Sequence, residues 1–224
     1  MMMFRIKICG VTSIADAVAA ADAGADAIGL NFYPGSSRYI SHARAAEIAA
    51  ALPAGTRKIG VFVNSAVDEV RHIARRLSLD GVQLHGDEPP DFLAGLVGIP
   101  VLRAFRLAAG GLPAVSNYLA ECRRLGATPD MVLLDSYCAG AFGGTGRTLD
   151  WTLAAAYHQL NSAPPLILAG GLVATNVAQA IAAVRPAAVD TASGVEASPG
   201  RKDHAQVAGF IAAAKAAFAE MKDN

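Results

Sequence analysis

Short runs of apolar residues alternate along the whole chain with longer stretches in which apolar residues recur every three or four positions. The short runs are typical of buried strands, and the longer stretches are typical of helices that pack one face against a core. The expected strands are residues 4–9, 26–32, 58–63, 81–85, 100–105, 130–135, 165–171 and 187–194.

A helix is expected after each strand. Serine followed three residues later by aspartate predicts the start of two of them, at Ser13 with Asp16 and at Ser65 with Asp68. The full set of expected helices is one from Ser13, 41–52, one from Ser65, 88–96, 113–125, one from near Thr148, one from near Thr175, and a last one whose apolar face runs from Val207 to Phe218.

Eight strand–helix units in 224 residues average 28 residues each. Parallel strands with intervening helices form either an open doubly wound sheet or a closed barrel. The open sheet usually carries a G-x-G-x-x-G fingerprint after its first strand, where this chain has CGVTSIAD. The number of units and the length therefore predict an α/β fold, a single (β/α)8 TIM barrel, with one domain covering residues 1–224.

Composition narrows the classes of function. Hydrophobic residues make up 53% and charged residues 17%, which is typical of a globular chain. Lysine plus arginine equals aspartate plus glutamate, 19 against 19, so net charge favours neither nucleic acid nor an anionic membrane as a partner. The three cysteines, at positions 9, 122 and 138, lack zinc-site spacing and argue against a disulfide framework. With no signal-peptide pattern at the start and no apolar run near ~20 residues, we expect a cytoplasmic protein with no membrane partner.

In a barrel of this kind the active site lies at the carboxyl ends of the strands. Polar residues gather at those ends, whereas most other strand positions are apolar, so we expect a binding site at one rim. The candidates are Cys9, Asn31, Arg38, Asn64, His85, Arg103 or Arg106, Asp135, Gly170, Gly171, Asp190, Ser193 and Gly194.

Two loops near the end of the chain favour a phosphate site. LAGGL contains Gly171 and TASGV contains Ser193 and Gly194, each at a turn before a helical segment. Glycine lets backbone N–H groups approach an anion closely, and barrels of this kind commonly bind phosphate after strands seven and eight. The alternative is that these glycines only form turns. The glycine-rich segment DSYCAGAFGGTGRTLDW, after the sixth strand, is either a lid that excludes water or a simple connector.

Four rim side chains have both a chemical and a structural interpretation. Cys9 is a base if its thiolate is accessible at working pH, and otherwise a small buried apolar residue. Asp135 at a strand end is a candidate acid, and His85 is either an acid–base group or a packed imidazole. Arg38 either binds a carboxylate or lies in solvent.

The motifs KICGVT, GLNFYPGSSRYI, VFVN, VQLHG, LLDS, FGGTGRTLDW, LAGGL and VDTASGVE, in this order, resemble the phosphoribosylanthranilate isomerase family of tryptophan biosynthesis. The resemblance runs from about Arg5 to about Phe218. It implies an Amadori rearrangement of N-(5-phosphoribosyl)anthranilate to 1-(2-carboxyphenylamino)-1-deoxyribulose 5-phosphate. In the family, an aspartate protonates the furanose ring oxygen and a cysteine removes the proton from C2.

Carried over position by position, the resemblance implies that Asp135 is the general acid and Cys9 the general base. It implies that Arg38 contacts the anthranilate carboxylate. The implied phosphate contacts are Gly171, Ser193 and Gly194, with Gly144 nearby. His85 and Asp190 match positions near the sugar, without an assigned role. No metal or organic cofactor is implied. The expected partner is the small phosphorylated substrate, and the expected state is a monomer or a homodimer.

Two alternatives stay open at this point. A related sugar-phosphate isomerase of the histidine pathway uses aspartates at the first and sixth strands and binds two phosphates. Cys9 in the first position, and one evident phosphate loop pair, argue against that activity. The other alternative is a barrel that binds a sugar phosphate without catalysis.

Overall fold

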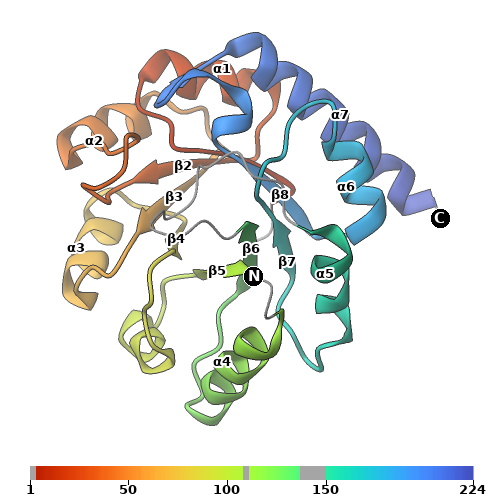
Figure 1. Ribbon diagram of the computed structural model, residues 1–224. Coiled ribbons are helices and arrows are strands. Elements are labelled where there is room, and N and C mark those ends of the chain that lie inside the picture. The colour runs from red at the N-terminus through yellow and green to blue at the C-terminus, as the bar shows by residue number, and fades with distance from the viewer. Residues whose placement is uncertain (1–3, 108–110, 137–149, 224) are drawn as a thin grey trace.

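Eight parallel strands close into a barrel, in the order β1 to β8, and helices surround it (Figure 1). The computed structural model describes residues 4–107, 111–136 and 150–223. The predicted (β/α)8 TIM barrel is confirmed. The barrel strands are β1 (Ile6–Cys9), β2 (Ala27–Asn31), β3 (Arg57–Phe62), β4 (Gly81–Leu84), β5 (Val101–Leu107), β6 (Met131–Ser136), β7 (Leu166–Leu168) and β8 (Ala188–Thr191).

Most of the helices lie in the connections between these strands. The α-helices are α1 (Ile14–Ala23), α2 (His42–Ala51), α3 (Val67–Arg76), α4 (Pro113–Arg124), α5 (Trp151–Ala155), α6 (Val177–Val184) and α7 (His204–Asp223). The 3-10 helices are η1 (Pro90–Leu96), η2 (Ala156–Gln159) and η3 (Ser193–Val195).

The barrel has two apolar clusters, one inside it and one between its strands and the surrounding helices. Successive strand residues point to opposite faces, so every second side chain points inward. The inner cluster consists of Phe4, Ala27, Ile59, Leu102, Ala104, Met131, Leu133, Ile167, Ala169 and Ala188. The outer, larger cluster contains strand residues whose side chains point outward, such as Ile6 and Ile8, together with the helix residues that they contact. The buried polar residues of the strands therefore lie where the inner apolar cluster ends.

The predicted helix starts are partly confirmed. Ser13 caps α1, because its Oγ accepts a hydrogen bond from Asp16 N at 3.0 Å. The Asp16 carboxylate does not complete a reciprocal capping box as expected; it accepts hydrogen bonds from Lys202 N and His204 Nε2. The expected start at Ser65 is wrong, since α3 begins at Val67 after Ala66, without a side-chain cap.

The segment predicted as a helix over 88–96 is instead the 3-10 helix η1. Two features account for this. Pro90 disfavours the helical conformation in the residue before it, so Pro89 is extended, with φ −74° and ψ 164°, and the helix cannot begin at Glu88. The Glu88 carboxylate is also bound elsewhere, because it accepts hydrogen bonds from Asn64 N at 2.8 Å and Gly86 N at 3.0 Å.

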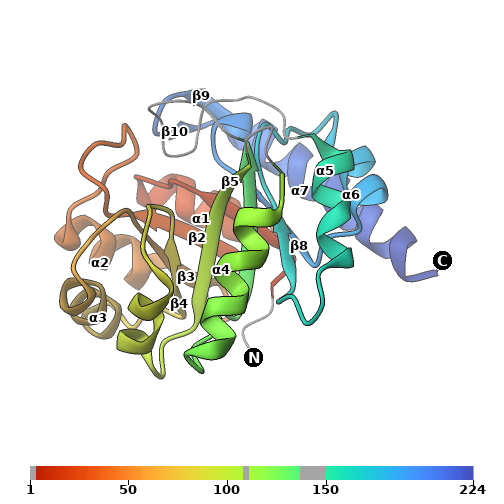
Figure 2. The same cartoon turned by 60° about the horizontal axis from the view of Figure 1, so that its bottom comes forward.

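A two-stranded hairpin after β8 was not predicted. Its strands, β9 (Glu196–Ser198) and β10 (Arg201–Lys202), pair antiparallel. Figure 2 shows this hairpin at the end of the barrel opposite the N-terminus. Lys202 is buried there at 4% exposure, so the hairpin brings a charged side chain into the rim. No helix among the described residues is long and apolar enough to span a membrane.

Candidate active site

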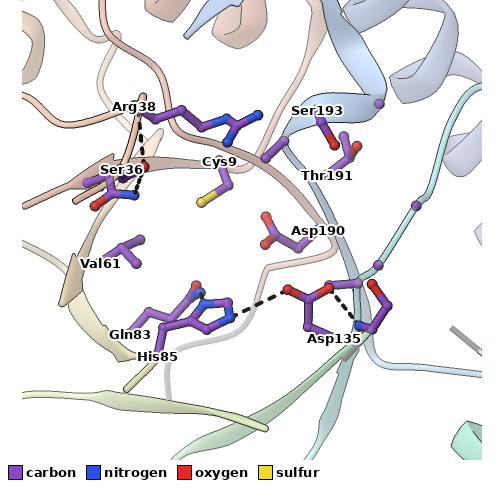
Figure 3. Close-up of a pocket in the computed structure, with 17 residues that line it drawn as sticks. Cys9, Ser36, Arg38, Val61, Gln83, His85, Asp135, Asp190, Thr191 and Ser193 are labelled. Carbon is purple, nitrogen blue, oxygen red and sulfur yellow. Dashed lines mark hydrogen bonds and ion pairs between the residues drawn. The ribbon is translucent and has the colours of Figure 1, made fainter. Parts of the chain in front are cut away.

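One pocket opens at the carboxyl ends of the barrel strands (Figure 3). Its volume is about 620 Å³ when the open solvent at its mouth is included. The predicted site residues that line it are Cys9, Asn31, Arg38, His85, Asp135, Gly170, Gly171, Asp190, Ser193 and Gly194. Gly144 and the expected lid segment 137–149 lie outside the described residues. Among the described residues, Asn64, Arg103 and Arg106 do not line this pocket, and Arg103 lies within β5, four residues before its carboxyl end.

Cys9 ends β1 with its side chain pointing into the pocket (Figure 3). Its register partner on β2 is Gly29, and a Cβ atom at Gly29 would lie 2.7 Å from Cys9 Sγ. A glycine is therefore required beside the thiol. Cys9 is 9% exposed, and burial raises the pKa of its thiol, while the positive charge of Lys7 acts to lower it. The arrangement is that of a buried thiol with one opening, toward the pocket.

Lys7 lies two residues before Cys9 on β1, on the same inward face. Its register partner on β8 is Asp190, and Lys7 Nζ donates to Asp190 Oδ1 at 2.9 Å. Lys7 is completely buried. Burial lowers the pKa of Lys7, but the charges of Asp190 and Cys9 more than offset this and raise it above its ordinary value. The Asp190 carboxylate therefore favours the charged form of Lys7 beneath the pocket.

Asp135 is the penultimate residue of β6 and faces His85, the residue directly after β4 (Figure 3). Asp135 Oδ2 lies 3.4 Å from His85 Nε2, and its Oδ1 accepts a hydrogen bond from Ser136 N at 2.8 Å. Gln83 Nε2 lies 2.9 Å from His85 Nδ1. Because this amide nitrogen donates to Nδ1, the ring proton of neutral His85 lies on Nε2, toward Asp135. Gln83 and His85 are hydrogen-bonded to each other, and the His85 ring approaches the Asp135 carboxyl group without a hydrogen bond between them.

Gly170 fixes the approach of the loop after β7 to Asp135. Its φ is +87°, and a Cβ atom there would lie 2.7 Å from Ser136 N and 3.1 Å from Asp135 Oδ1. Only glycine combines that backbone angle with such a close contact at low cost.

Arg38 reaches the pocket from the loop after β2 (Figure 3). Glu196 of β9 holds it, with Nε donating at 2.8 Å and Nη2 at 2.6 Å. Lys202 Nζ donates to the same carboxylate at 2.9 Å and to Ala192 O at 2.9 Å. Burial opposes ionisation of Glu196, but Arg38 and Lys202 together hold its pKa below the ordinary value. Arg38 is therefore a positioned side chain, not a solvated one.

The loop after β7 is tied to the end of β8 on one side of the pocket, because Thr191 Oγ1 donates to Leu172 O at 2.8 Å. Within the same loop, Asn176 Nδ2 donates to Gly171 O at 3.0 Å. Gly171, Ser193 and Gly194 line the pocket from these two loops. Within the described residues, no group of three or more His, Cys, Asp or Glu side chains is arranged to bind a metal ion.

A sequence model described as N-(5'-phosphoribosyl)anthranilate (PRA) isomerase matches residues 6–213. The chain belongs to the PRA isomerase family. N-(5'-phosphoribosyl)anthranilate isomerase from Geobacter metallireducens is 45% identical over 215 residues, which cover 96% of this chain and 100% of the relative. The enzyme of that name from Chromohalobacter salexigens is 48% identical over 211 residues, 94% of each chain.

Solved PRA isomerase structures also match the fold. The phosphoribosyl anthranilate isomerase from Thermotoga maritima superposes with a TM-score of 0.83 at 38% identity, over 96% of this chain and 100% of the other. A family structure in complex with reduced 1-(o-carboxyphenylamino)-1-deoxyribulose 5-phosphate superposes with a TM-score of 0.81 at 37% identity, with the same coverage.

Sequence reasoning missed four polar side chains that shape this PRA isomerase site: Lys7, Gln83, Glu196 and Lys202. A signal for the first two exists. Lys7 precedes Cys9 by two residues and Gln83 precedes His85 by two, so alternation along a strand gives each pair a common face. For Lys202 no comparable signal exists, because its place depends on a short irregular hairpin.

Proposed function

We propose that this chain catalyses the Amadori rearrangement of N-(5'-phosphoribosyl)anthranilate to 1-(2-carboxyphenylamino)-1-deoxyribulose 5-phosphate, with Asp135 as the acid and Cys9 as the base. The observation that supports these roles is that both side chains line one pocket, from β6 and β1. The same pocket is lined by an arginine and by the loops after β7 and β8. The substrate has matching parts: a benzoate, a sugar and a phosphate.

The first step uses Asp135. Its protonated carboxyl group gives a proton to the furanose ring oxygen, the bond from that oxygen to C1 breaks, and the amine nitrogen lone pair forms the C1=N bond of a protonated Schiff base. The Asp135 carboxylate that remains accepts a hydrogen bond from Ser136 N–H, and the His85 ring lies 3.4 Å away without hydrogen-bonding to it. The Ser136 donor supports the proposed role because it favours the charged form that the step creates.

The second step uses Cys9. The thiolate removes the proton from C2, and that electron pair moves to form the C1=C2 bond of an enolamine while the nitrogen becomes neutral. Return of a proton to C1 and loss of the C2 hydroxyl proton give the ketone. The proton and electron balance needs no oxidant and no cofactor.

Three contacts orient the substrate in this proposal. Arg38 binds the anthranilate carboxylate. Glu196 accepts hydrogen bonds from Arg38 Nε and Nη2, and no described residue accepts one from Nη1, so Nη1 is available to a ligand. The phosphate binds at Gly171, Ser193 and Gly194, on the side of the pocket formed by the loops after β7 and β8. Backbone N–H groups of such loops bind anions. His85 and Asp190 face the sugar. A contact from Gly144, and a monomeric or dimeric state, remain predictions from sequence.

The test is loss of phosphoribosylanthranilate fluorescence with purified wild type, Cys9→Ala and Asp135→Asn. Removing a general acid or base costs about 10²- to 10⁴-fold, so we expect a loss of that size in kcat for each variant. Cys122→Ala is the matched control, because Cys122 is a buried thiol on α4 that does not line the pocket. Undiminished turnover by Cys9→Ala would remove the base assignment, and no turnover by wild type would remove the activity. Turnover of the histidine-pathway substrate, measured separately by product formation, tests the competing isomerase.

A further inference from the structure

Lys7 is a charged side chain that the proposed reaction does not use, and it lies inside the barrel with 0% exposure. A buried ammonium group is costly unless it is paired and hydrogen-bonded. Lys7 Nζ donates to Asp190 Oδ1 at 2.9 Å. The register explains the pair, since Lys7 and Asp190 are direct neighbours on β1 and β8. Asp190 lines the pocket and Lys7 does not, so the lysine lies behind the aspartate as seen from the pocket.

Lys7 also acts on Cys9. The two residues are two positions apart on one strand, so both side chains point into the barrel. The positive charge of Lys7 acts to lower the pKa of the thiol, against the larger effect of burial, which raises it. Cys9 is thus placed between a buried cation below it and the pocket in front of it.

The other charged groups around Cys9 come from three further elements. Asp190 of β8 and Lys202 of β10 act on the thiol, and so does Arg38 from the loop after β2. Glu196 neutralises part of the charge of Arg38 and Lys202, since it pairs with both. Three cations therefore face two carboxylates near the thiol. Across the pocket, Asp135 is neutral in its proposed role as a proton donor, with His85 beside it.

We propose that Lys7 is a positioning residue for the base: its buried ammonium stabilises the thiolate of Cys9, and Asp190 holds that ammonium in place. This inference rests on the proposed role of Cys9 and deepens it. Burial alone favours the neutral thiol, which is a poor base. An adjacent fixed cation favours the thiolate and so opposes that effect without exposing the sulfur to water. The three cations near the thiol exceed the two carboxylates by one positive charge, and the thiolate of Cys9 supplies the third negative charge.

The experiment measures the thiolate directly, without substrate. Iodoacetamide reacts with the thiolate and not the thiol, so the rate of Cys9 alkylation against pH, followed on the Cys9 peptide by mass spectrometry, reports its titration. For Lys7→Met, which keeps the length of the side chain, we expect the profile to move to higher pH by about one unit. That shift lowers the alkylation rate at pH 7.5 about tenfold.

Asp190→Asn is the opposing variant. It removes the negative charge and leaves Lys7 unneutralised, so alkylation of Cys9 should become faster at the same pH. Opposite changes in the two variants support the proposal. An unchanged profile in Lys7→Met, or changes in the same direction in both variants, would overturn it, because altered access to the pocket does not depend on the sign of the charge. Circular dichroism checks whether Lys7→Met folds. If it does not fold, the Asp190→Asn variant decides: an unchanged alkylation profile overturns the proposal, and a profile shifted to lower pH supports it. Failure of the wild type to isomerise phosphoribosylanthranilate would remove the proposed function but not move these profiles.

Discussion

Glu196 holds Arg38 by both carboxylate oxygens, with Arg38 Nε at 2.8 Å from Oε1 and Nη2 at 2.6 Å from Oε2. The two side chains are 158 positions apart in sequence and are 4% and 11% exposed, with Glu196 the more buried. Because a bidentate pair fixes the plane of the guanidinium, the edge of Arg38 that remains is presented to the pocket.

Arg38→Ala should weaken binding of ligands that carry the anthranilate carboxylate. A charge-assisted hydrogen-bonded contact contributes about 1.5–3 kcal/mol, so the Kd of the reduced product analogue should rise about 10- to 100-fold. Calorimetric titration of that analogue, and of the same compound without its carboxylate, measures the effect. Equal losses for both ligands would exclude a carboxylate contact. Arg124→Ala, at an exposed position on α4, is the control and should change neither Kd.

Glu196→Gln should weaken the same ligands through Arg38. The amide keeps one acceptor but loses the negative charge that pairs with Arg38 and Lys202. We expect KM to rise more than kcat falls, because the guanidinium is no longer fixed for carboxylate binding. Steady-state kinetics measure the split. Glu121→Gln removes an exposed glutamate paired with Arg124 and should leave both constants unchanged. A fall in kcat alone would argue against this account of Glu196.

The same carboxylate predicts a pH dependence of stability. The pKa of folded Glu196 lies below its ordinary value, which is about 4.3 in the unfolded chain. Its contribution is therefore present above that unfolded value and is lost as pH falls through the lower folded value. Urea unfolding between pH 7 and pH 3 should show a smaller loss of unfolding free energy for Glu196→Gln than for wild type. At pH 7 the variant should be less stable by about 3 kcal/mol, since it leaves buried cations without their partner. Parallel curves for the two proteins would contradict the prediction.

Gly170→Ala should impair catalysis by displacing Asp135. The added Cβ meets Ser136 N at 2.7 Å and Asp135 Oδ1 at 3.1 Å, at a residue with φ of +87°. We expect a fall in kcat of about tenfold or more, because small displacements of an acid are costly. Gly126→Ala is a matched control with φ of +70° and no atom within 4 Å of the new Cβ. Both variants should lose stability to backbone strain, and only the first should lose turnover beyond that. Similar turnover in the two would mean that Gly170 does not position Asp135.

How much of this could be predicted from sequence depends on the kind of feature. The alternation of strands and helices predicts the barrel, and the barrel brings Cys9 and Asp135 to one rim, because all parallel strands end there. The Ser13 cap was predictable because it depends on four consecutive residues. The Ser65 start failed since Asn64, just before it, is tied to Glu88 and Asp87, which are distant in sequence.

The charged surroundings of the site were harder to predict. Strand alternation alone puts Lys7 on the face of Cys9, but its pairing with Asp190 follows from the closure of β1 against β8. Arg38 is held in place because a hairpin brings Glu196 to it, and the two short strands of that hairpin, of three and two residues, carry no clear periodic pattern. Long-range ion pairs of this kind depend on three-dimensional packing and not on local sequence.

The most direct test of the central claim is a crystal structure of this chain with reduced 1-(o-carboxyphenylamino)-1-deoxyribulose 5-phosphate. The account predicts Cys9 Sγ within about 4 Å of C2 and an Asp135 carboxyl oxygen within about 3.2 Å of the C4 hydroxyl group that derives from the ring oxygen. It also predicts the ligand carboxylate on Arg38 and the phosphate on Gly171, Ser193 and Gly194. A ligand bound with C2 out of reach of Cys9, or with its phosphate on Arg38 and its carboxylate on the glycine loops, would contradict the account.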